Sequence, residues 1–425
     1  MIEWSESDEL IREAIREFID NEIRPYRDEL ESGKVPPYDI IRKLFSSFGV
    51  GAMATEAFEQ YLEHHEATST AAPGEDNDGS AAGGAGFRLA GQESMLLVAI
   101  SELAGVSLGI LASASVSLGL AAGTIASTGT IEQQRRWVPP LLTFDKVGAW
   151  AITEPEAGSD AFGGMTTTVR RDGSGGYVLS GHKTFITNGP YADTIVVYAK
   201  LDEQDGTPLR ERPVLTFVLD GDMDGLERST PFKKMGLGSS PTGELSFHQI
   251  HLGPERLLGG AEPTPGGRDT RSDAGRASAR ANFTAERIGV AALSLGIINE
   301  CHRLCVDYAR ERTLWDQEIG RFQLIQAKLA EMEIARLNTQ NMIFQTIAKL
   351  REGTFPSLAE ASAMKLYSSR AATEVAMEAV QLFGGNGYMT EYHVEQLARD
   401  AKGLMIYAGS NEIQTTHIAK GLLGW

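Results

Sequence analysis

Cysteine is nearly absent from this chain of 425 residues, which contains only Cys301 and Cys305. So few cysteines exclude a disulfide scaffold. The pair lies on one face of a predicted helix that also contains His302. A metal site there is conceivable, but small apolar core residues are the preferred interpretation. We therefore predict no metal site.

Basic residues are also under-represented. The chain has 39 lysine and arginine residues against 57 aspartate and glutamate residues, for a formal net charge of -18. Phosphate groups would be repelled by such a surface, which argues against general nucleic-acid binding.

Long hydrophobic runs are scarce as well. The longest apolar region, Leu96 to Ile125, is interrupted by serine and glycine throughout, whereas a bilayer span needs about 20 apolar residues. The N-terminus is acidic at Glu3, Glu6 and Asp8, where a targeting peptide would be basic. We expect no membrane span and a cytoplasmic protein.

Several common catalytic motifs are missing from the sequence. It contains no Walker loop, and no Gly-x-Gly-x-x-Gly opens a helix after a strand, so a Rossmann-type nicotinamide site is not expected. It also lacks His-Glu-x-x-His, paired Cys-x-x-Cys and Gly-x-Ser-x-Gly, which argues against zinc enzymes and serine hydrolases.

The order of patterns along the chain is helices, then a β-module, then helices. Helical spacing covers Glu9–Asn21 and Tyr38–Phe48, and short strand-like runs separated by turn residues follow in the middle. Because no long helices separate these runs, we expect an antiparallel sheet. The predicted units are a helical domain (1–148) with a flexible insert (about 67–86), a β-domain (149–258), a linker (259–281) and a helical bundle (282–425).

Four segments stand out together. They are Trp150–Asp160 (WAITEPEAGSD), Lys183–Gly189 (KTFITNG), Glu311–Trp315 (ERTLW) with Gln323 downstream, and Gln381–Tyr388 (QLFGGNGY), which leads to Tyr407–Gln414 (YAGSNEIQ). In this order and spacing they resemble the acyl-CoA dehydrogenase family. The resemblance covers nearly the whole chain apart from the two low-complexity stretches. It implies an α+β fold with an N-terminal helical domain, a middle antiparallel β-domain and a C-terminal four-helix bundle.

The resemblance also implies FAD as cofactor. Thr153 and Thr187 would offer hydroxyls to the flavin edge, and Phe185 would pack against the ring, where many relatives have tryptophan. Arg312 and Gln323 match positions that reach the FAD of a neighbouring subunit. The full set of expected cofactor residues is Trp150, Ile152, Thr153, Phe185, Thr187, Arg312, Trp315, Gln323, Gln381, Gly384, Gly385, Ser410 and Asn411.

Alanine occupies one position where many relatives have a catalytic glutamate. Ala408 cannot accept a proton, although its backbone N–H could still bind a thioester oxygen. Members of the long-chain and isovaleryl type carry the glutamate on an earlier helix, before an arginine, and this chain has Glu286-Arg287 there. We therefore predict Glu286 as the base; Glu412 is a less favoured alternative. Expected substrate contacts are Ser159, Arg287, Tyr407 and Gly409.

The implied reaction is α,β-dehydrogenation of an acyl-CoA, as in β-oxidation, by a homotetramer or homodimer that passes electrons to an electron-transfer flavoprotein. Three related flavin reactions stay open: an acyl-CoA oxidase, an enoyl-CoA reductase and a dehydrogenase of carrier-bound acyl groups. A non-catalytic FAD-binding or assembly protein is a further alternative, because Ala408 replaces the usual glutamate. The sequence does not size the acyl pocket.

Overall fold

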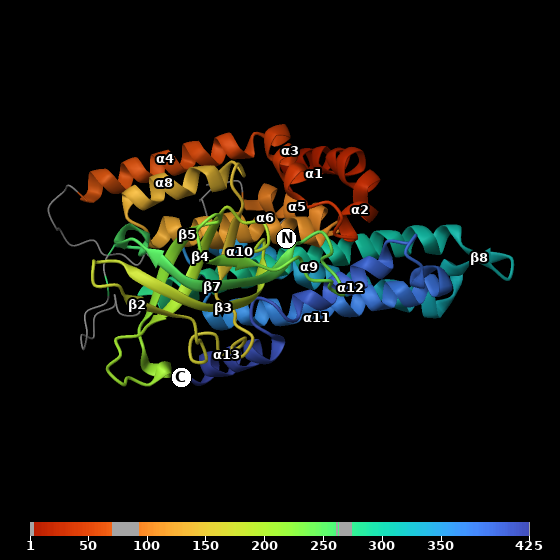
Figure 1. Ribbon diagram of the computed structural model, residues 1–425. Coiled ribbons are helices and arrows are strands. Elements are labelled where there is room, and N and C mark those ends of the chain that lie inside the picture. The colour runs from red at the N-terminus through yellow and green to blue at the C-terminus, as the bar shows by residue number, and fades with distance from the viewer. Residues whose placement is uncertain (1–3, 70–92, 261, 263–273, 425) are drawn as a thin grey trace.

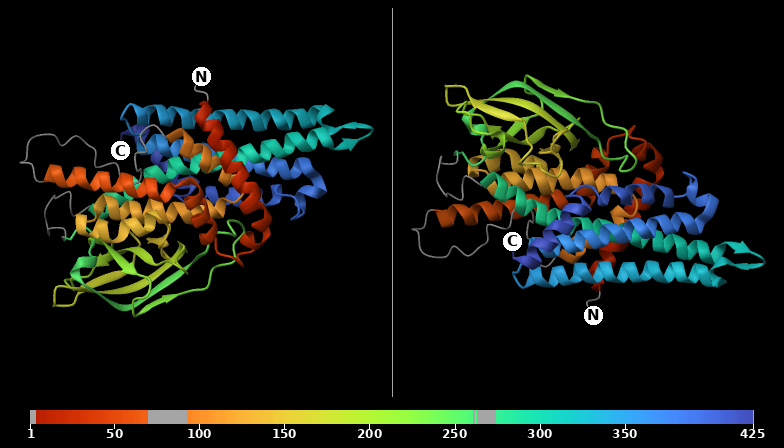
Figure 2. Two further views of the ribbon diagram at one scale, coloured as in Figure 1. Left: turned by 90° about the horizontal axis from the view of Figure 1, so that it is seen from above. Right: turned by 90° about the horizontal axis from the view of Figure 1, so that it is seen from below.

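Helices, a β-sheet and longer helices follow one another along the chain (Figure 1). The computed structural model describes residues 4–69, 93–260, 262 and 274–424. This arrangement confirms the predicted fold class. The sheet lies beside the N-terminal helices, and the longest helices extend beyond both (Figure 2).

The N-terminal helices match the predicted ones where the apolar spacing is regular. The predicted helix Glu9–Asn21 forms as α1 followed by η1, and a capping box at Ser5 and Asp8 begins it. Helix α4 continues to Ser69, so the predicted insert is wrong for its first residues, and residues 70–86 lie outside the described ones. The elements are α1 Glu6–Phe18, η1 Ile19–Ile23, η2 Arg24–Tyr26, α2 Arg27–Glu31, α3 Tyr38–Phe48, α4 Val50–Ser69, α5 Glu93–Ala104, α6 Leu108–Ser115, η4 Val116–Ala122, α7 Gly123–Thr128 and α8 Ile131–Leu142.

The segment Leu108–Thr128, which contains α6, η4 and α7, corrects one expectation. It has 21 residues, and its most apolar stretch has a mean hydropathy of 1.7, so by length and composition it could cross a membrane. Its serine and glycine residues lower the hydropathy less than expected because they are nearly neutral. However, 67% of its most apolar stretch is buried inside the molecule. Ser117 Oγ accepts a hydrogen bond of 2.9 Å from the Gly148 N–H, so the segment packs as a core helix against the sheet.

The β-domain contains β1 Gly148–Ala151, β2 Thr168–Arg171, β3 Tyr177–Thr187, β4 Thr194–Leu201, β5 Val214–Asp220, β6 Leu226–Arg228 and β7 Thr242–Leu252, with short helical turns η5 Leu209–Glu211 and η6 Pro254–Arg256. The strand order is β1-β4-β2-β3-β7-β6, and β5 also pairs with β4. Most pairs are antiparallel as expected, but β1 and β2 both run parallel to β4. The sheet is therefore mixed, because a β-hairpin rather than a helix makes the crossover between β1 and β4.

The C-terminal domain contains α9 Ala274–Glu311, β8 Thr313–Leu314, β9 Gln317–Glu318, η8 Ile319–Arg321, α10 Gln323–Arg351, α11 Leu358–Phe383, η9 Gly384–Tyr388, α12 Val394–Leu404 and α13 Asn411–Leu423. Helix α9 begins inside the predicted linker, so that prediction is wrong for residues 274–281. Alanine and arginine in this stretch favour helix more strongly than its glycine and serine oppose it. The β8–β9 hairpin lies at the tip of the bundle, far from the sheet (Figures 1 and 2).

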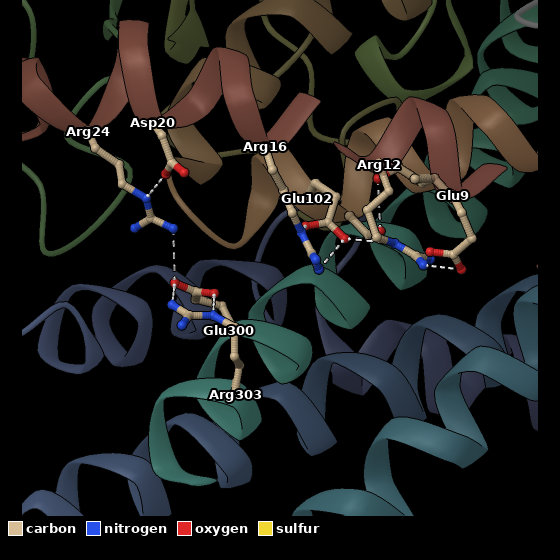
Figure 3. Close-up of polar contacts among 10 residues, drawn as sticks. Glu9, Arg12, Arg16, Asp20, Arg24, Glu102, Glu300 and Arg303 are labelled. Carbon is tan, nitrogen blue, oxygen red and sulfur yellow. Dashed lines mark hydrogen bonds and ion pairs between the residues drawn. The ribbon is translucent and has the colours of Figure 1, made fainter. Parts of the chain in front are cut away.

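Ion pairs join the N-terminal helices to α5 and α9 (Figure 3). Glu102 of α5 accepts from Arg12 and Arg16 of α1, at 3.1 and 2.8 Å. Glu300 of α9 contacts Arg24 at 3.4 Å and Arg303 at 2.8 Å. Together with the apolar core beneath them, these pairs fix the direction of α9, on which the predicted base lies.

Candidate active site

Glu286 lies on α9, where that helix passes α11 and the turn between α12 and α13. Its side chain is partly buried. Burial raises the pKa of this carboxyl to about 7, and the nearby positive charges of Arg287 and Lys365 oppose the rise. A carboxyl that changes charge near neutral pH is suited to proton transfer.

The turn Tyr407–Ser410 faces the same region. Ala408 is buried and has a φ of 57°, and Gly409 has a φ of 80°. The left-handed conformation is rare for a residue with a side chain and marks a constrained position. Within the described part of the chain, no protein oxygen accepts the Ala408 N–H. The predicted backbone donor is therefore free to bind a ligand.

Gln414 of α13 holds this turn from one side. Its Nε2 donates to the carbonyl oxygens of Ala408 and Gly409, at 3.0 and 2.7 Å. Its Oε1 accepts from Arg287 Nε at 2.7 Å. The predicted substrate residue Arg287 is thus buried and tied to the turn, and it stands directly after the predicted base.

Lys365 of α11 holds the turn from the other side. Its fully buried ammonium group donates to Gly409 O at 2.9 Å and to Asn411 Oδ1 at 3.0 Å. Ser369 Oγ donates to the same Asn411 oxygen at 3.1 Å. Burial lowers the pKa of Lys365 to about 8, and the charge of Glu286 opposes that fall. Lys365 therefore bonds the turn directly and influences the base through its charge.

The end of β1 brings the other predicted cofactor residues toward α9. Trp150 and Ile152 are buried, and the Trp150 ring meets Phe283, one turn before Glu286, at 5.9 Å between centroids. Thr153 is partly buried, and its carbonyl oxygen accepts from the Thr184 N–H at 2.9 Å. The contact between Trp150 and Phe283 thus joins the predicted cofactor residues of the sheet to the helix that carries Glu286.

A bulge in β3 exposes the predicted aromatic wall. The pairing of β3 with β7 shifts between Lys183 and Ile186, and Phe185 there has a φ of 57° and is 67% exposed. Such an exposed aromatic in a strand is ready to cover a planar ligand. Thr187 follows on the strand, partly buried and opposite Thr242. Ser159 is exposed in the loop after β1.

The remaining predicted cofactor residues lie elsewhere. Arg312, Trp315, Gln323, Gln381, Gly384 and Gly385 are all exposed near the tip of the bundle. The helical stretch from Glu286 to Glu311 alone spans about 37 Å at 1.5 Å per residue. One chain therefore does not bring the two groups of residues together. We call these exposed residues the tip group. We call the residues described above around Glu286, the Tyr407–Asn411 turn, the end of β1 and the bulge of β3 the central group.

Three polar atoms of the central group are buried without a hydrogen-bond partner in the described part of the protein: Arg287 Nη1, Tyr407 Oη and Asn411 Nδ2. Leaving such atoms unpaired is costly. With the free Ala408 N–H and the exposed Phe185 ring, they fit a polar, partly planar ligand such as a flavin with a thioester beside it.

Three family models match successive parts of the chain: the acyl-CoA dehydrogenase N-terminal domain at residues 80–145, its middle domain at 149–250 and its C-terminal domain at 273–423. An acyl-CoA dehydrogenase of Bacillus subtilis is 32% identical, over 98% of this chain and 97% of that protein. The chain belongs to the acyl-CoA dehydrogenase family. Membership confirms the predicted oxidoreductase class and the family's cofactor, FAD.

Two further relatives differ in the activity that they are named for. The caffeyl-CoA reductase-Etf complex subunit CarC of Acetobacterium woodii is 31% identical over 99% of both chains. The solved butyryl-CoA dehydrogenase of Megasphaera elsdenii is 29% identical, covers 100% of both chains and has a TM-score of 0.81. The family acts on acyl-CoA thioesters by dehydrogenation or reduction, and the long-chain or isovaleryl placement stays a prediction.

Sequence reasoning missed Lys365 and Gln414. A lysine among the apolar residues of a predicted helix was the available signal for Lys365, because a buried lysine needs partners.

Cys301 and Cys305 lie in the core, where burial raises the pKa of both thiols. Glu412, the alternative base, is exposed, and hydrogen bonds at the start of α13 lower the pKa of its carboxyl.

Proposed function

We propose that this protein carries out α,β-dehydrogenation of acyl-CoA thioesters with Glu286 as the base. The observation that carries the proposal is the position of Glu286, a partly buried carboxyl beside the free Ala408 N–H turn. The Glu286 carboxylate would take a proton from the α-carbon of the acyl group. FAD, when bound, supplies the acceptor for the hydride that leaves the β-carbon.

The Ala408 turn supports this proposal by offering a donor to the thioester oxygen. Negative charge builds up on that oxygen as the α-proton leaves, so a fixed N–H is most effective there. Gln414 and Lys365 hold the carbonyl oxygens of the next two peptide units, Ala408 O and Gly409 O. A backbone donor needs no glutamate side chain, so Ala408 is compatible with catalysis.

Of the central group, Thr153, Phe185 and Thr187 would hold the flavin ring, and Trp150 and Ile152 would support them from beneath. Ser410 and Asn411 would meet the cofactor or the thioester at the start of α13. Ser159, Tyr407 and Gly409 would line the path of the substrate. These roles follow from the resemblance and from the positions described above.

The tip group would serve a second copy of the chain. Arg312, Gln323 and Gln381 lie too far from Glu286 for one chain to use them at its own site, and a guanidinium suits a pyrophosphate group. Exposed Trp315, at 81%, and Leu324, at 80%, lie in the same region. We therefore propose a homotetramer or homodimer in which the tip of one copy completes the site of another.

Reduction of an enoyl-CoA is the second candidate, because one full-length relative is named as a caffeyl-CoA reductase. A carboxyl with a pKa of about 7 serves both directions: ionised, it takes the α-proton, and protonated, it returns one. That relative's name also includes Etf, which supports an electron-transfer flavoprotein as partner. A cytoplasmic location and a role in β-oxidation complete the proposal.

The decisive experiment mixes the purified holoenzyme anaerobically with a panel of acyl-CoAs and, after prior reduction, with enoyl-CoAs. Bleaching of the flavin absorbance by a saturated acyl-CoA supports dehydrogenation, and reoxidation only by an enoyl-CoA supports the reductase. Glu286→Gln should retain flavin and lose bleaching, whereas Glu412→Gln should bleach normally. Full activity of Glu286→Gln would contradict the proposed base, and peroxide release in air would mark an oxidase.

A further inference from the structure

The feature without an assigned function is the buried lysine of α11. Lys365 has no solvent exposure; it donates to the turn that carries Ala408, and its charge acts on Glu286. An ammonium group is strongly hydrated, so its burial is unfavourable unless partners compensate. Within the described residues, Lys365 donates hydrogen bonds to two neutral oxygens, one from the Gly409 backbone and one from Asn411. Its formal charge is therefore left for a carboxylate to balance.

Three titratable or charged groups interact electrostatically with Glu286. They are Arg287 on its own helix, Lys365 on α11 and Tyr407 in the turn. In the next layer, Glu412 interacts with Lys365, and His417 interacts with Arg287. Arg287 donates to Gln414, whereas Lys365 donates to a carbonyl oxygen of the turn itself.

We propose that Lys365 is a positioning residue that serves the base and the thioester site together. By bonding Gly409 O it fixes the Gly409–Ser410 peptide at the end of the turn, and by its charge it favours the ionised form of Glu286. The inference rests on the proposed role of Glu286. It goes further by assigning a second residue, on a different helix, to the protonation state of the base.

A conservative change separates the two tasks of Lys365. Lys365→Arg keeps the charge and Lys365→Met removes it with similar chain length. Asn411→Asp leaves Lys365 in place and sets a carboxylate against it, so this nearly isosteric variant tests the charge even if Lys365→Met does not fold. Lys200→Met is the matched control, because Lys200 is also fully buried and donates to a backbone oxygen, Gly163 O, at 2.9 Å, but lies on β4.

The first measurement is an infrared pH titration of the purified protein without substrate, in which the carboxylic-acid band of Glu286 is the one lost in Glu286→Gln. We expect Lys365→Met and Asn411→Asp to move that titration to higher pH. We expect Lys365→Arg and Lys200→Met to leave it close to that of the wild type. An identical Glu286 titration in wild type and both charge variants would overturn the inference.

The second measurement is the pH profile of anaerobic flavin reduction by the best acyl-CoA. The acid limb should move to higher pH in Lys365→Met, with a rate about tenfold lower at pH 6.5 and a smaller deficit at pH 9, since a tenfold lower ionised fraction corresponds to one pH unit. A uniform loss at every pH would mean support of the turn alone and would overturn the charge assignment. If Glu286→Gln retained full activity, the proposed base would fail, while the infrared titration would still report on Lys365.

Discussion

At the scale of single residues, the left-handed turn at Ala408 and Gly409 sets the direction of the free N–H. A Cβ added at Gly409 would lie 2.7 Å from Gln414 Nε2 and 3.4 Å from Arg287 Nη2. The turn, the glutamine and the arginine are therefore packed as one unit.

We expect Gly409→Ala to lower the free energy of unfolding by on the order of 1–3 kcal/mol, because it adds a crowded side chain at a positive φ. It should also reduce the rate of flavin reduction, since Gln414 must move. Gly353→Ala is the control, because Gly353 has a φ of 77° but nothing within 4 Å of the added Cβ. Equal losses in chemical denaturation for the two variants would argue against a role of the packing.

The pKa of Glu286 predicts opposite pH dependences for the two directions of reaction. Because burial raises this pKa to about 7, the carboxylate that takes a proton predominates above pH 7 and is lost as the pH falls. The rate of acyl-CoA oxidation should therefore rise through this range, and the rate of enoyl-CoA reduction should fall. Stopped-flow measurement from pH 5.5 to 9 checks both, and a flat profile in both directions would refute the assignment.

The residues of the central group were predictable to different degrees. Glu286, Arg287 and the Tyr407 turn follow from motifs in the sequence, and the structure brings them together. Lys365 and Gln414 are single polar residues on otherwise ordinary helices. The apolar neighbours of Lys365 indicate burial but not its partners, and no local pattern marks Gln414. Their importance comes from tertiary contacts, which no spacing in the sequence reports.

At the scale of elements, a buried ion pair fixes the end of β1 against β3. Lys183 donates to Glu154 at 2.8 Å and to the Ile152 carbonyl at 3.0 Å. Glu154 also accepts from the Thr166 N–H and the Thr167 N–H. The pair thus holds the segment that presents Thr153.

Removing one member of this pair should be strongly destabilising. We expect Lys183→Met to lower the free energy of unfolding by about 3–5 kcal/mol, because it leaves the Glu154 charge buried and unpaired, and to weaken flavin binding. Arg210→Ala is the control, because it removes an exposed partner of Asp160. It should change the free energy of unfolding by less than about 1 kcal/mol. Urea unfolding and flavin release measure both, and a loss for Lys183→Met as small as the control's would contradict the role given to the pair.

The elements with clear periodicity were predictable, and those set by topology were not. The helix Tyr38–Phe48 appears where the sequence predicts it. The parallel pairing of β1 with β4 depends on how the chain returns after the β2–β3 hairpin. The early start of α9 follows from alanine and arginine residues whose helix propensity outweighs that of the glycine and serine beside them.

At the scale of the whole molecule, α9 separates the central group from the tip group. We expect Trp315→Ala with Leu324→Ala to weaken self-association and flavin retention together, because both exposed apolar side chains lie beside the tip group. Leu10→Ala, which alters a residue of α1 that is 62% exposed, is the control. Sedimentation velocity with flavin absorbance checks this; an unchanged oligomer that retains its flavin would contradict the proposed interface.

The length of α9 has a genetic consequence. If each catalytic centre takes its base from one copy and its tip residues from another, two defective alleles can rescue each other. A chain with Glu286→Gln and a chain with Arg312→Ala would each be inactive alone. Co-expressed, they would form hybrids in which some centres combine the intact half of each, so partial activity would reappear in the mixture.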